Sequence, residues 1–528
     1  MKKWNKWDSK YSNNKYDAII IGSGISGLTC GSVLSNHGKR VLILEKHFKA
    51  GGWTHTFKRK NYEWDVGIHY IGEVHKLLSP TRKIFDYITD SQLEWNKMDD
   101  NYDRIIFPDQ AYNFTAPYKR FVDDMVEYFP GRRDQFEKYI SLINESVKSG
   151  LPFFANKALP NWLSYFTYKK MSNPFHKYSD VSTKEVIMNI FNDEIILGVL
   201  TGQWGDHGLP PNQSSFAMHA MVVRHYLDGG NYPVGTSRRI AETVTDSIEK
   251  NGGDVFVNAG VKKIITKGNK AIGVLLENGD EVFGTTIISS AGVFNTFNKM
   301  LPSSFKNNRL QNKLNTVIPT FSYHSLHIGI KKSFSEFQTT NTNLWIYPGY
   351  NHDKNVDDYL NNQSKNFPLL YISFPSAKDP SATQKNPNFS TIEAITVANW
   401  DSFSKWKEQP WKKRGDEYNR YKKQITNNIL ETVYKYIPKL NSSVDYHELS
   451  TPLTVRSLAN YSVGEMYGIS HEPNRFRQKW LRPQTDIKNL YLTGQDILTV
   501  GVTSAMFSGI ITTSAILRKN IFKKILGS

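Results

Sequence analysis

The chain has 528 residues, of which 39% are hydrophobic and 22% charged, with 35 glycines and 22 prolines. These proportions exclude a collagen-like, low-complexity or wholly disordered chain and indicate a globular protein with room for more than one domain. The net charge of +17 favours anionic partners such as phosphates, anionic lipids or anionic ligands. The single cysteine, Cys30, rules out an internal disulfide, a dithiol relay and a zinc site built on several cysteines, and we expect no metal.

The first predicted elements form a strand–helix–strand unit. Residues 17–21 are a β-branched run suited to a strand buried on both faces, residues 25–37 have helical character, and residues 40–44 form a second apolar strand. A helix that starts directly after a strand offers free N–H groups and a positive dipole to phosphates. This order of elements is typical of a dinucleotide-binding domain.

Three glycines and one glutamate give this unit its chemistry. Gly22 permits the tight turn, Gly24 lets the backbone approach a pyrophosphate, and Gly27 lets the helix pack closely on the strand. Glu45, after the second strand, is placed to accept hydrogen bonds from the hydroxyls of an adenosine ribose. Its negative charge disfavours a 2′-phosphate, so the ligand at this point is FAD or NAD rather than NADP.

The segment that follows distinguishes between these two ligands. Gly51 and Gly52 come shortly after the second strand, and residues 63–72 contain the string GIHYIG. Residues 16–72 resemble the N-terminus of the flavin-dependent family of phytoene desaturases, carotenoid cis-trans isomerases and all-trans-retinol 13,14-reductases. GIHYIG most resembles the retinol saturase branch. The resemblance implies FAD as the cofactor, with Gly51 and Gly52 beside it, in a Rossmann-like domain of the flavin amine oxidase type.

The middle and the end of the chain carry matching motifs. Residues 225–235 resemble the segment that returns the family's chain to the cofactor domain, and NLYLTGQD, ending at Asp496, resembles its closing flavin motif. The resemblance implies that a strand ending at Gly494 delivers Asp496 to the ribityl and phosphate part of FAD. It also implies that a helix starting near Val502 points its N-terminus at the flavin, and that the backbone of Val261 lies on adenine.

The motifs divide the chain into two interleaved domains. The flavin-binding domain is predicted from residues 16–80, 229–300 and 451–528, and the substrate-binding domain from residues 81–228 and 301–450. In the second domain, alternating β-branched and aromatic residues predict the strands of a mixed or antiparallel sheet at residues 320–330, 344–348, 368–376 and 391–400. Spaced apolar positions predict a surface helix within residues 401–440. The expected fold class is α/β, with an α+β organisation overall.

The resemblance implies an FAD-dependent oxidoreductase that acts on C=C bonds of a long apolar polyene or isoprenoid lipid, most closely a saturase. It places His69 and Tyr70 beside the flavin ring, where they are the candidates for the proton donor. A desaturase or cis-trans isomerase is the alternative, and a non-enzymatic isoprenoid carrier of the Rab GDP-dissociation inhibitor kind is another. Because no second nucleotide motif is present, a reductant, with NAD(P)H as one candidate, reaches the flavin transiently through an open cleft or from another protein.

Residues 151–178 combine eight aromatic residues with four lysines and no acidic residue. Such a composition is typical of a segment at an anionic membrane surface, with an ordinary aromatic cap on the substrate domain as the alternative. The basic N-terminus precedes no long apolar stretch, and residues 500–517 are interrupted by serine, threonine and glycine. We therefore expect a cytoplasmic, peripherally membrane-associated protein. No nucleic-acid-binding motif is found, so no nucleic acid is expected, and the oligomeric state stays open.

Overall fold

The first of two large sheets has a parallel centre covered by helices. The computed structural model describes residues 2–336 and 340–527. In this sheet β10, β2, β1 and β13 are neighbours in parallel, β19 pairs in parallel with the end of β13, and β12 and β11 continue antiparallel from its beginning. The strands are β1 (Tyr16–Ile21), β2 (Val41–Leu44), β10 (Asp254–Phe256), β11 (Val261–Lys267), β12 (Lys270–Leu276), β13 (Glu281–Ser289) and β19 (Leu490–Leu492).

Burial explains why the central strands are almost wholly apolar. Ile20 and Ile43 belong to a core cluster with residues of α1 (Ile25–Ser35), α9 (Arg238–Lys250) and α18 (Val502–Leu517) on one face. Residues of β1 and β2 that point to the other face pack with β11, β12 and the segment after β13. Both faces are therefore covered, as the continuous apolar runs predict.

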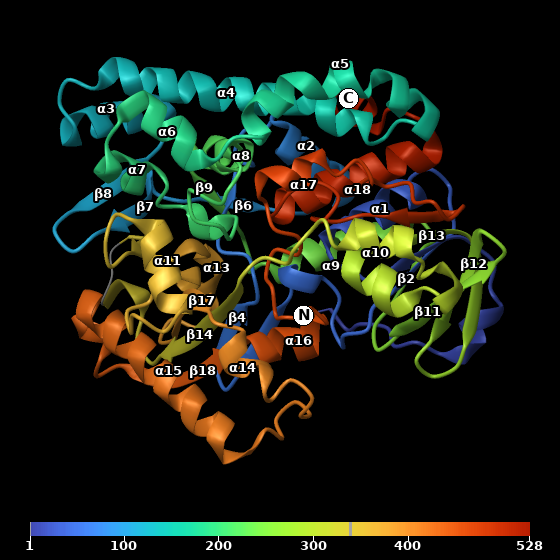
Figure 1. Ribbon diagram of the computed structural model, residues 1–528. Helices are drawn as coiled ribbons and strands as arrows, with labels where there is room; N and C mark the ends of the chain where they lie inside the picture. The colour runs from blue at the N-terminus through green and yellow to red at the C-terminus, as the bar shows by residue number, and fades with distance from the viewer. Residues whose placement is uncertain (1, 337–339, 528) are drawn as a thin grey trace.

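The second sheet lies at the lower left of Figure 1. Its order is β18-β14-β17-β16-β15-β7-β8, and every pair is antiparallel except β15–β7. The strands are β7 (Asn101–Ile106), β8 (Ala111–Thr115), β14 (Ser322–Ile330), β15 (Asn343–Ile346), β16 (Leu370–Ser373), β17 (Ser390–Ala398) and β18 (Val444–Ser450). The long helix α15 (Gly415–Tyr436) packs Ile425, Ile429 and Val433 against this sheet.

Helices and two small sheets complete the molecule. In Figure 1, α4 (Arg133–Asn156) and α5 (Asn161–Ser179) run along the top edge as one long layer. The smaller sheets are β5-β9-β6 and β3-β4, formed by β3 (Thr56–Arg59), β4 (Tyr62–Asp65), β5 (Ile71–Gly72), β6 (Trp95–Lys97) and β9 (Gly230–Pro233). The other helices include α2 (Pro80–Ile88), α3 (Tyr118–Tyr128), α6 (Thr183–Phe191), α7 (Glu194–Leu200), α8 (Phe216–Tyr226), α10 (Asn308–Leu314), α11 (His352–Leu360), α12 (Pro375–Lys378), α13 (Pro380–Lys385), α14 (Asp401–Ser404), α16 (Pro452–Ala459), α17 (Pro473–Arg477) and α19 (Ile521–Leu526).

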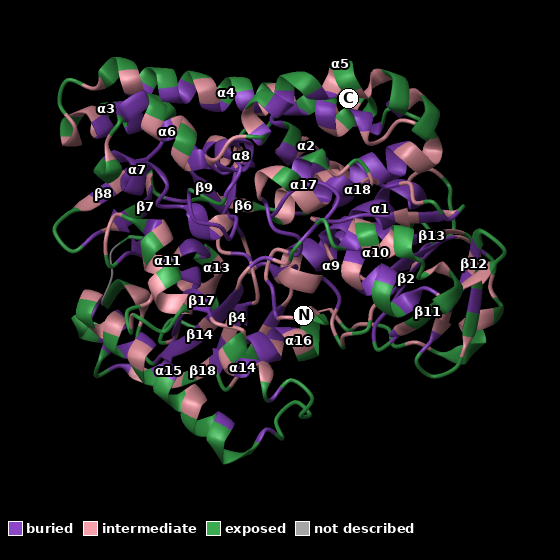
Figure 2. Cartoon of the chain, in the orientation of Figure 1, coloured by how far each residue is buried: buried purple, intermediate pink, exposed green. Residues whose placement is uncertain are grey.

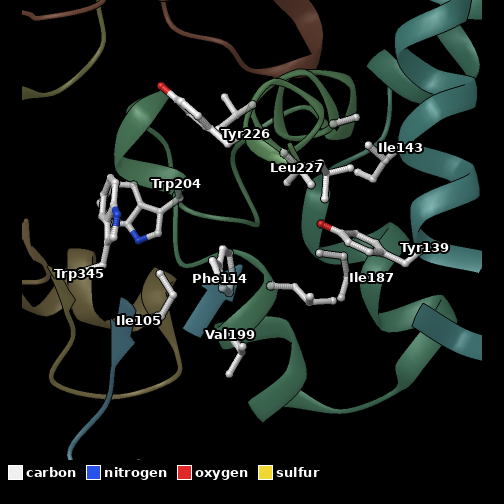
Figure 3. Close-up of a cluster of buried hydrophobic side chains, with 14 of the residues drawn as sticks. Ile105, Phe114, Tyr139, Ile143, Ile187, Val199, Trp204, Tyr226, Leu227 and Trp345 are labelled. Carbon is white, nitrogen blue, oxygen red and sulfur yellow. The ribbon is translucent and has the colours of Figure 1, made fainter. Parts of the chain in front are cut away.

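An aromatic-rich core lies between the helical layer and the second sheet. Figure 2 shows buried residues concentrated on the inner faces of these elements, while α4, α5 and α15 turn exposed residues outward. Figure 3 shows part of this core, in which Ile105, Trp204 and Trp345 come from three distant parts of the sequence. The core therefore joins segments that the chain order separates widely.

The predicted fold class is confirmed, as are the strands expected within residues 320–400 and the helix expected before residue 440. The helix expected over residues 25–37 is α1, which ends at Ser35. The strands of the first sheet come from all three pieces assigned to a flavin-binding domain. The division into two interleaved domains stays our proposal.

Gly27→Ala is predicted to lower the free energy of unfolding by about 1–3 kcal/mol, the usual cost of overpacking. The added methyl group would lie 2.3 Å from the carbonyl oxygen of Gly22. Gly24→Ala is the matched control at the same turn, because the nearest atom to its methyl group would be Ser290 Oγ at 3.7 Å. Urea unfolding of the ligand-free variants compares them, and equal losses in both would contradict the packing role of Gly27.

Candidate active site

In the glycine turn after β1, Gly27 is packed against backbone, whereas Gly24 has free space beside it. An added Cβ at Gly27 would collide with the Gly22 carbonyl, so this position fixes the contact between α1 and β1. At Gly24, which precedes the first residue of α1, an added Cβ would meet nothing closer than 3.7 Å. The N-terminus of α1 is therefore approachable by a ligand, as a pyrophosphate site requires.

Glu45 fastens this turn to the end of β2. Its Oε2 accepts hydrogen bonds from Ser23 N at 2.8 Å and Ser23 Oγ at 2.7 Å, and its Oε1 accepts from His47 N at 2.8 Å. The residue is still partly exposed. The backbone of Ala259, two residues before Val261, donates to Glu45 O at 2.7 Å. The structure thus brings Glu45 and the segment leading to Val261 to the same place.

Gly51 and Gly52 lie against the same turn. Gly51 N donates to Ser23 Oγ at 3.0 Å, and Gly51 has a φ of +121°, which favours glycine. An added Cβ at Gly52 would lie 3.0 Å from Gly24 Cα. This close backbone approach explains why glycines occupy the loop after β2.

The C-terminal motif joins this region from the other side. Asp496 is buried, its Oδ2 accepts from Val293 N at 2.8 Å, and its Oδ1 accepts from Ile469 N at 3.0 Å. Its carboxylate therefore fastens two backbone segments, and a contact with a ribityl group stays a prediction. Gly494 has a φ of +113° and donates to Ser508 Oγ at 2.9 Å.

The first turn of α18 contains a buried hydroxyl group that has no hydrogen-bond partner within the described residues. Val502 is its first residue and is partly exposed, and Thr503 Oγ1 is buried with no hydrogen-bond partner in the described part of the chain. A helix N-terminus with a free hydroxyl suits the polar edge of a bound cofactor. The residues present therefore fit a dinucleotide flavin: an open N-terminus of α1 at one end and this unsatisfied N-terminus at the other.

His69 contacts an unexpected carboxyl group. Its Nδ1 lies 3.0 Å from Glu393 Oε2, although the angles are not those of a hydrogen bond. Burial lowers the pKa of His69 to about 3, and the charge of Lys378 adds to this shift. His69 is thus a neutral imidazole near neutral pH. Glu393, fully buried on β17, has a pKa raised by burial to about 8, a shift that the Lys378 charge and the nearby Asp65 backbone oppose. Within the described residues neither of its carboxyl oxygens has a well-formed hydrogen bond.

Tyr70 lies between two carboxyl groups. Its phenol oxygen is 2.9 Å from Asp103 Oδ2 and 3.1 Å from Asp206 Oδ2. Asp103 also accepts from Gln203 Nε2 at 2.7 Å and Asn343 Nδ2 at 2.8 Å. Burial raises the pKa of Asp206 to about 8, with a further contribution from the charge of Asp103.

One ammonium group accompanies these acids. Lys378 is fully buried and its Nζ donates to His69 O at 2.9 Å, Asn343 Oδ1 at 2.5 Å and Ser373 Oγ at 2.8 Å. Burial lowers its pKa to about 7. A further buried acid, Asp65 at the end of β4, accepts from Ser237 N at 3.0 Å. We call Asp65, Asp103, Asp206, Glu393 and Lys378 together the carboxyl cluster.

An aromatic shell surrounds Asp206. Six tyrosines lie around this residue and its loop: the Tyr70 oxygen is 3.1 Å from Asp206 Oδ2, Tyr226 stacks on Tyr70, Tyr323 and Tyr347 donate to Gly205 O and Gly202 O, Tyr371 packs on Trp345, and Tyr467 packs on Gly208. Trp204 and Trp345 belong to the same core, and in the described residues Tyr371 OH, Trp204 Nε1 and Trp345 Nε1 are buried without partners. The shell is thus a mainly apolar, buried part of the core that contains a few unmet polar atoms.

His69 and Tyr70 were predicted from the sequence as candidate site residues, whereas Asp103, Lys378 and Glu393 were not. These three lie inside β7, α12 and β17, where no motif marks them. Asp206 was the only one with a usable signal, because it lies in the glycine-rich stretch GQWGDHGLPP.

Comparisons with known proteins agree with this geometry. An NAD(P)-binding Rossmann-like domain model matches residues 20–88. The chain is 34% identical to an all-trans-retinol 13,14-reductase of Danio rerio over 96% of this chain and 86% of that protein. It is 24% identical to prolycopene isomerase 2 of an Oncidium hybrid over 94% and 83%. Cyclohexylamine oxidase of Brevibacterium oxydans shares the fold, with a TM-score of 0.59 and 15% identity over 96% of this chain and 100% of that chain. The chain therefore belongs to the all-trans-retinol 13,14-reductase family of flavin-dependent oxidoreductases, which also includes carotenoid isomerases as more distant relatives.

Proposed function

We propose that this protein is a flavoenzyme that reduces a C=C bond of an apolar polyene of the retinoid or carotenoid type. The observation that carries the proposal is the similarity over nearly the whole chain to all-trans-retinol 13,14-reductase. The aromatic shell beside Tyr70 supports it, because flat rings suit a conjugated chain.

The chain's own residues would hold FAD along one line. Gly22, Gly24 and the N-terminus of α1 would receive the pyrophosphate, and Glu45 would accept from the ribose. Val261 would contact the adenine, and Val502 with the start of α18 the flavin end. Gly27, Gly51, Gly52, Gly494 and Asp496 would keep these segments close enough to do so. When bound, a reduced flavin supplies hydride chemistry.

His69 and Tyr70 are proposed to shape the reacting side of the site. As a neutral imidazole, His69 would orient the substrate without adding charge. The pKa of Tyr70 is raised well above its usual value by burial and by the charge of Asp103. Tyr70 would therefore stay protonated and hold Asp206 in place through its phenol oxygen.

Isomerisation or desaturation on the same scaffold is the second candidate, favoured by the similarity to a prolycopene isomerase. A carrier without flavin is disfavoured by the open, unobstructed Gly24. For the reductant we propose NAD(P)H, or a protein that delivers electrons, acting transiently at the flavin.

We also propose attachment to an anionic membrane through α4 and α5. Of the aromatic residues in 151–178, Phe153 and Phe175 are buried in the core, whereas Trp162, Tyr165 and Phe166 are 66%, 79% and 75% exposed. Beside them is an open hollow of about 1280 Å³ whose lining includes Lys169, Arg309, Lys313, Lys479 and Lys488. Exposed rings beside cations match a lipid interface. No described helix is long and apolar enough to cross a bilayer.

Purified protein is predicted to bind FAD in a one-to-one ratio. Glu45→Ala should weaken binding by about 1.5–3 kcal/mol, because a charged hydrogen-bond acceptor is lost. Gly24→Ala should weaken it as well, because a methyl group would stand where the pyrophosphate approaches. Flavin fluorescence titration measures both, with Asp416→Asn on the exposed face of α15 as the control. Stoichiometric NAD in place of flavin would refute the assignment.

Anaerobically reduced protein is predicted to oxidise its flavin on addition of all-trans-retinol and to release a product heavier by two hydrogens. Mass spectrometry and flavin absorbance follow the two events. A product of unchanged mass would indicate isomerisation, and a lighter product from oxidised protein would indicate desaturation.

Liposome flotation is predicted to require anionic lipid and to weaken with salt, because the attraction is electrostatic. Replacing Trp162, Tyr165 and Phe166 by serine should abolish flotation. Replacing Phe283 and Trp411, which are 48% and 40% exposed elsewhere, is the control and should not. Flotation that is equal on neutral and anionic liposomes would show that charge plays no part.

A further inference from the structure

We propose that Asp206 is the catalytic acid of this site and delivers a proton to the carbon of the C=C bond that does not receive the hydride. The inference rests on the proposed function and goes beyond it by naming the proton donor.

Tyr70, Asp103 and Asp206 share hydrogen bonds that require a proton on one of the two acids. A phenol has one O–H and can donate to only one acceptor at a time. Two carboxyl oxygens, from Asp103 and Asp206, nevertheless lie within 3.1 Å of the Tyr70 oxygen. An ionised pair would leave one carboxylate facing a phenol lone pair in a buried site. One of the two acids must therefore carry a proton and donate it to Tyr70.

The hydrogen-bond partners decide which acid this is. Asp103 accepts from Tyr70, Gln203 and Asn343, which together stabilise a carboxylate. Among the described side chains, Tyr70 alone lies within hydrogen-bond distance of Asp206. Asp103 is thus the carboxylate and Asp206 the carboxylic acid. Burial raises the pKa of both acids, but three hydrogen bonds oppose that shift in Asp103 and only the one from Tyr70 opposes it in Asp206.

The other members of the site are weaker donors near neutral pH. His69 is already neutral, and the pKa of Tyr70 is raised further from neutrality. Glu393 holds a proton but is fully buried, whereas Asp206 is partly exposed. A general acid works best when its pKa is near the operating pH, which Asp206 satisfies.

The loop that carries Asp206 is linked by packing to the closing flavin motif. This loop packs on Tyr467, because an added Cβ at Gly208 would lie 3.0 Å from that ring. The next residue, Gly468, lies against Asp496 of the closing motif, at 2.2 Å for an added Cβ. Asp206 is thus connected to the flavin motif through one short, closely packed segment.

The proposed step adds one hydride and one proton across the C=C bond. The π bond breaks, one carbon takes the hydride with its two electrons, and the other carbon takes the proton from Asp206. Asp206 is left as a carboxylate, and its exposed face takes a new proton from solvent. The titratable groups close enough to interact electrostatically with Asp206 are Tyr70, Asp103, Tyr226, Tyr323, Tyr347, Tyr371, Lys378 and Tyr467, and of these Tyr70 is in hydrogen-bond contact with it.

The test compares wild-type protein with Asp206→Asn, loaded with FAD and given all-trans-retinol after anaerobic reduction. Saturation should slow by about 10²–10⁴-fold, the range of general acid catalysis, while FAD binding is retained. The wild-type rate should fall as the pH rises above about 8, and this alkaline limb should be absent from the variant. Asp416→Asn is the exposed control.

A second readout does not depend on activity. The folded pKa of Asp206 is raised from 3.8, so the folded state binds the proton more tightly than the unfolded chain. The stability of wild type relative to Asp206→Asn should therefore fall as the pH rises from about 4 to about 8. A pH-independent difference would overturn the proposal.

Two further outcomes separate the proposal from the function. Saturation by Asp206→Asn at the wild-type rate, or loss of the alkaline limb in Glu393→Gln instead, would overturn the role of Asp206 and leave the proposed function intact. If wild type saturates no polyene, the proposed function fails. The stability readout then still decides whether Asp206 carries the proton.

Discussion

The structure depends on burying three carboxyl groups and one ammonium group, with the partly exposed Asp206 beside them, where the first segments of the chain meet the second sheet. An isolated charge in such a place is expensive, so each group must either be hydrogen bonded or give up its charge. Asp65 and Asp103 are hydrogen bonded: Asp65 accepts from Tyr232 and from Ser237 N and Oγ. Asp206 and Glu393 have few or no donors, and for them neutrality is the less costly state.

This cluster also explains how distant segments are held in register. Lys378 links the backbone of His69 to Asn343 on β15 and Ser373 on β16. Asp65, at the end of β4, holds β9 and the start of α9 through side-chain contacts. The same bonds that satisfy the buried groups therefore hold the backbone of His69 and the phenol oxygen of Tyr70 in place. The hydrogen bonds of Lys378 and Asp65 thus stabilise the fold and also hold the segment that carries His69 and Tyr70.

Local rules were enough to predict the first strand–helix–strand unit and its glycine turn, whereas the other cofactor segments were predicted from the family resemblance. The glycine spacing gives the turn, its open side and its closed side, because each depends on atoms within a few residues of one another. The alternation in residues 320–400 likewise predicts strands. The sequence offered no comparable signal for β7, β8 and β18, which are short or carry polar residues, nor for the parallel pairing of β15 with β7. Asp103, Lys378 and Glu393 acquire meaning only when three separate elements are packed together, which no local pattern encodes. Asp206 shows the intermediate case, since its glycine-rich surroundings marked the loop but not the acid.

Infrared spectroscopy of the folded protein at neutral pH tests the central claim most directly, since the C=O stretch of a carboxylic acid is distinct from the bands of a carboxylate. Wild type should give a carboxylic acid signal, with separate parts of it lost in Asp206→Asn and in Glu393→Gln. A wild-type spectrum without any carboxylic acid signal would show that the buried carboxyl groups are ionised and would contradict the account.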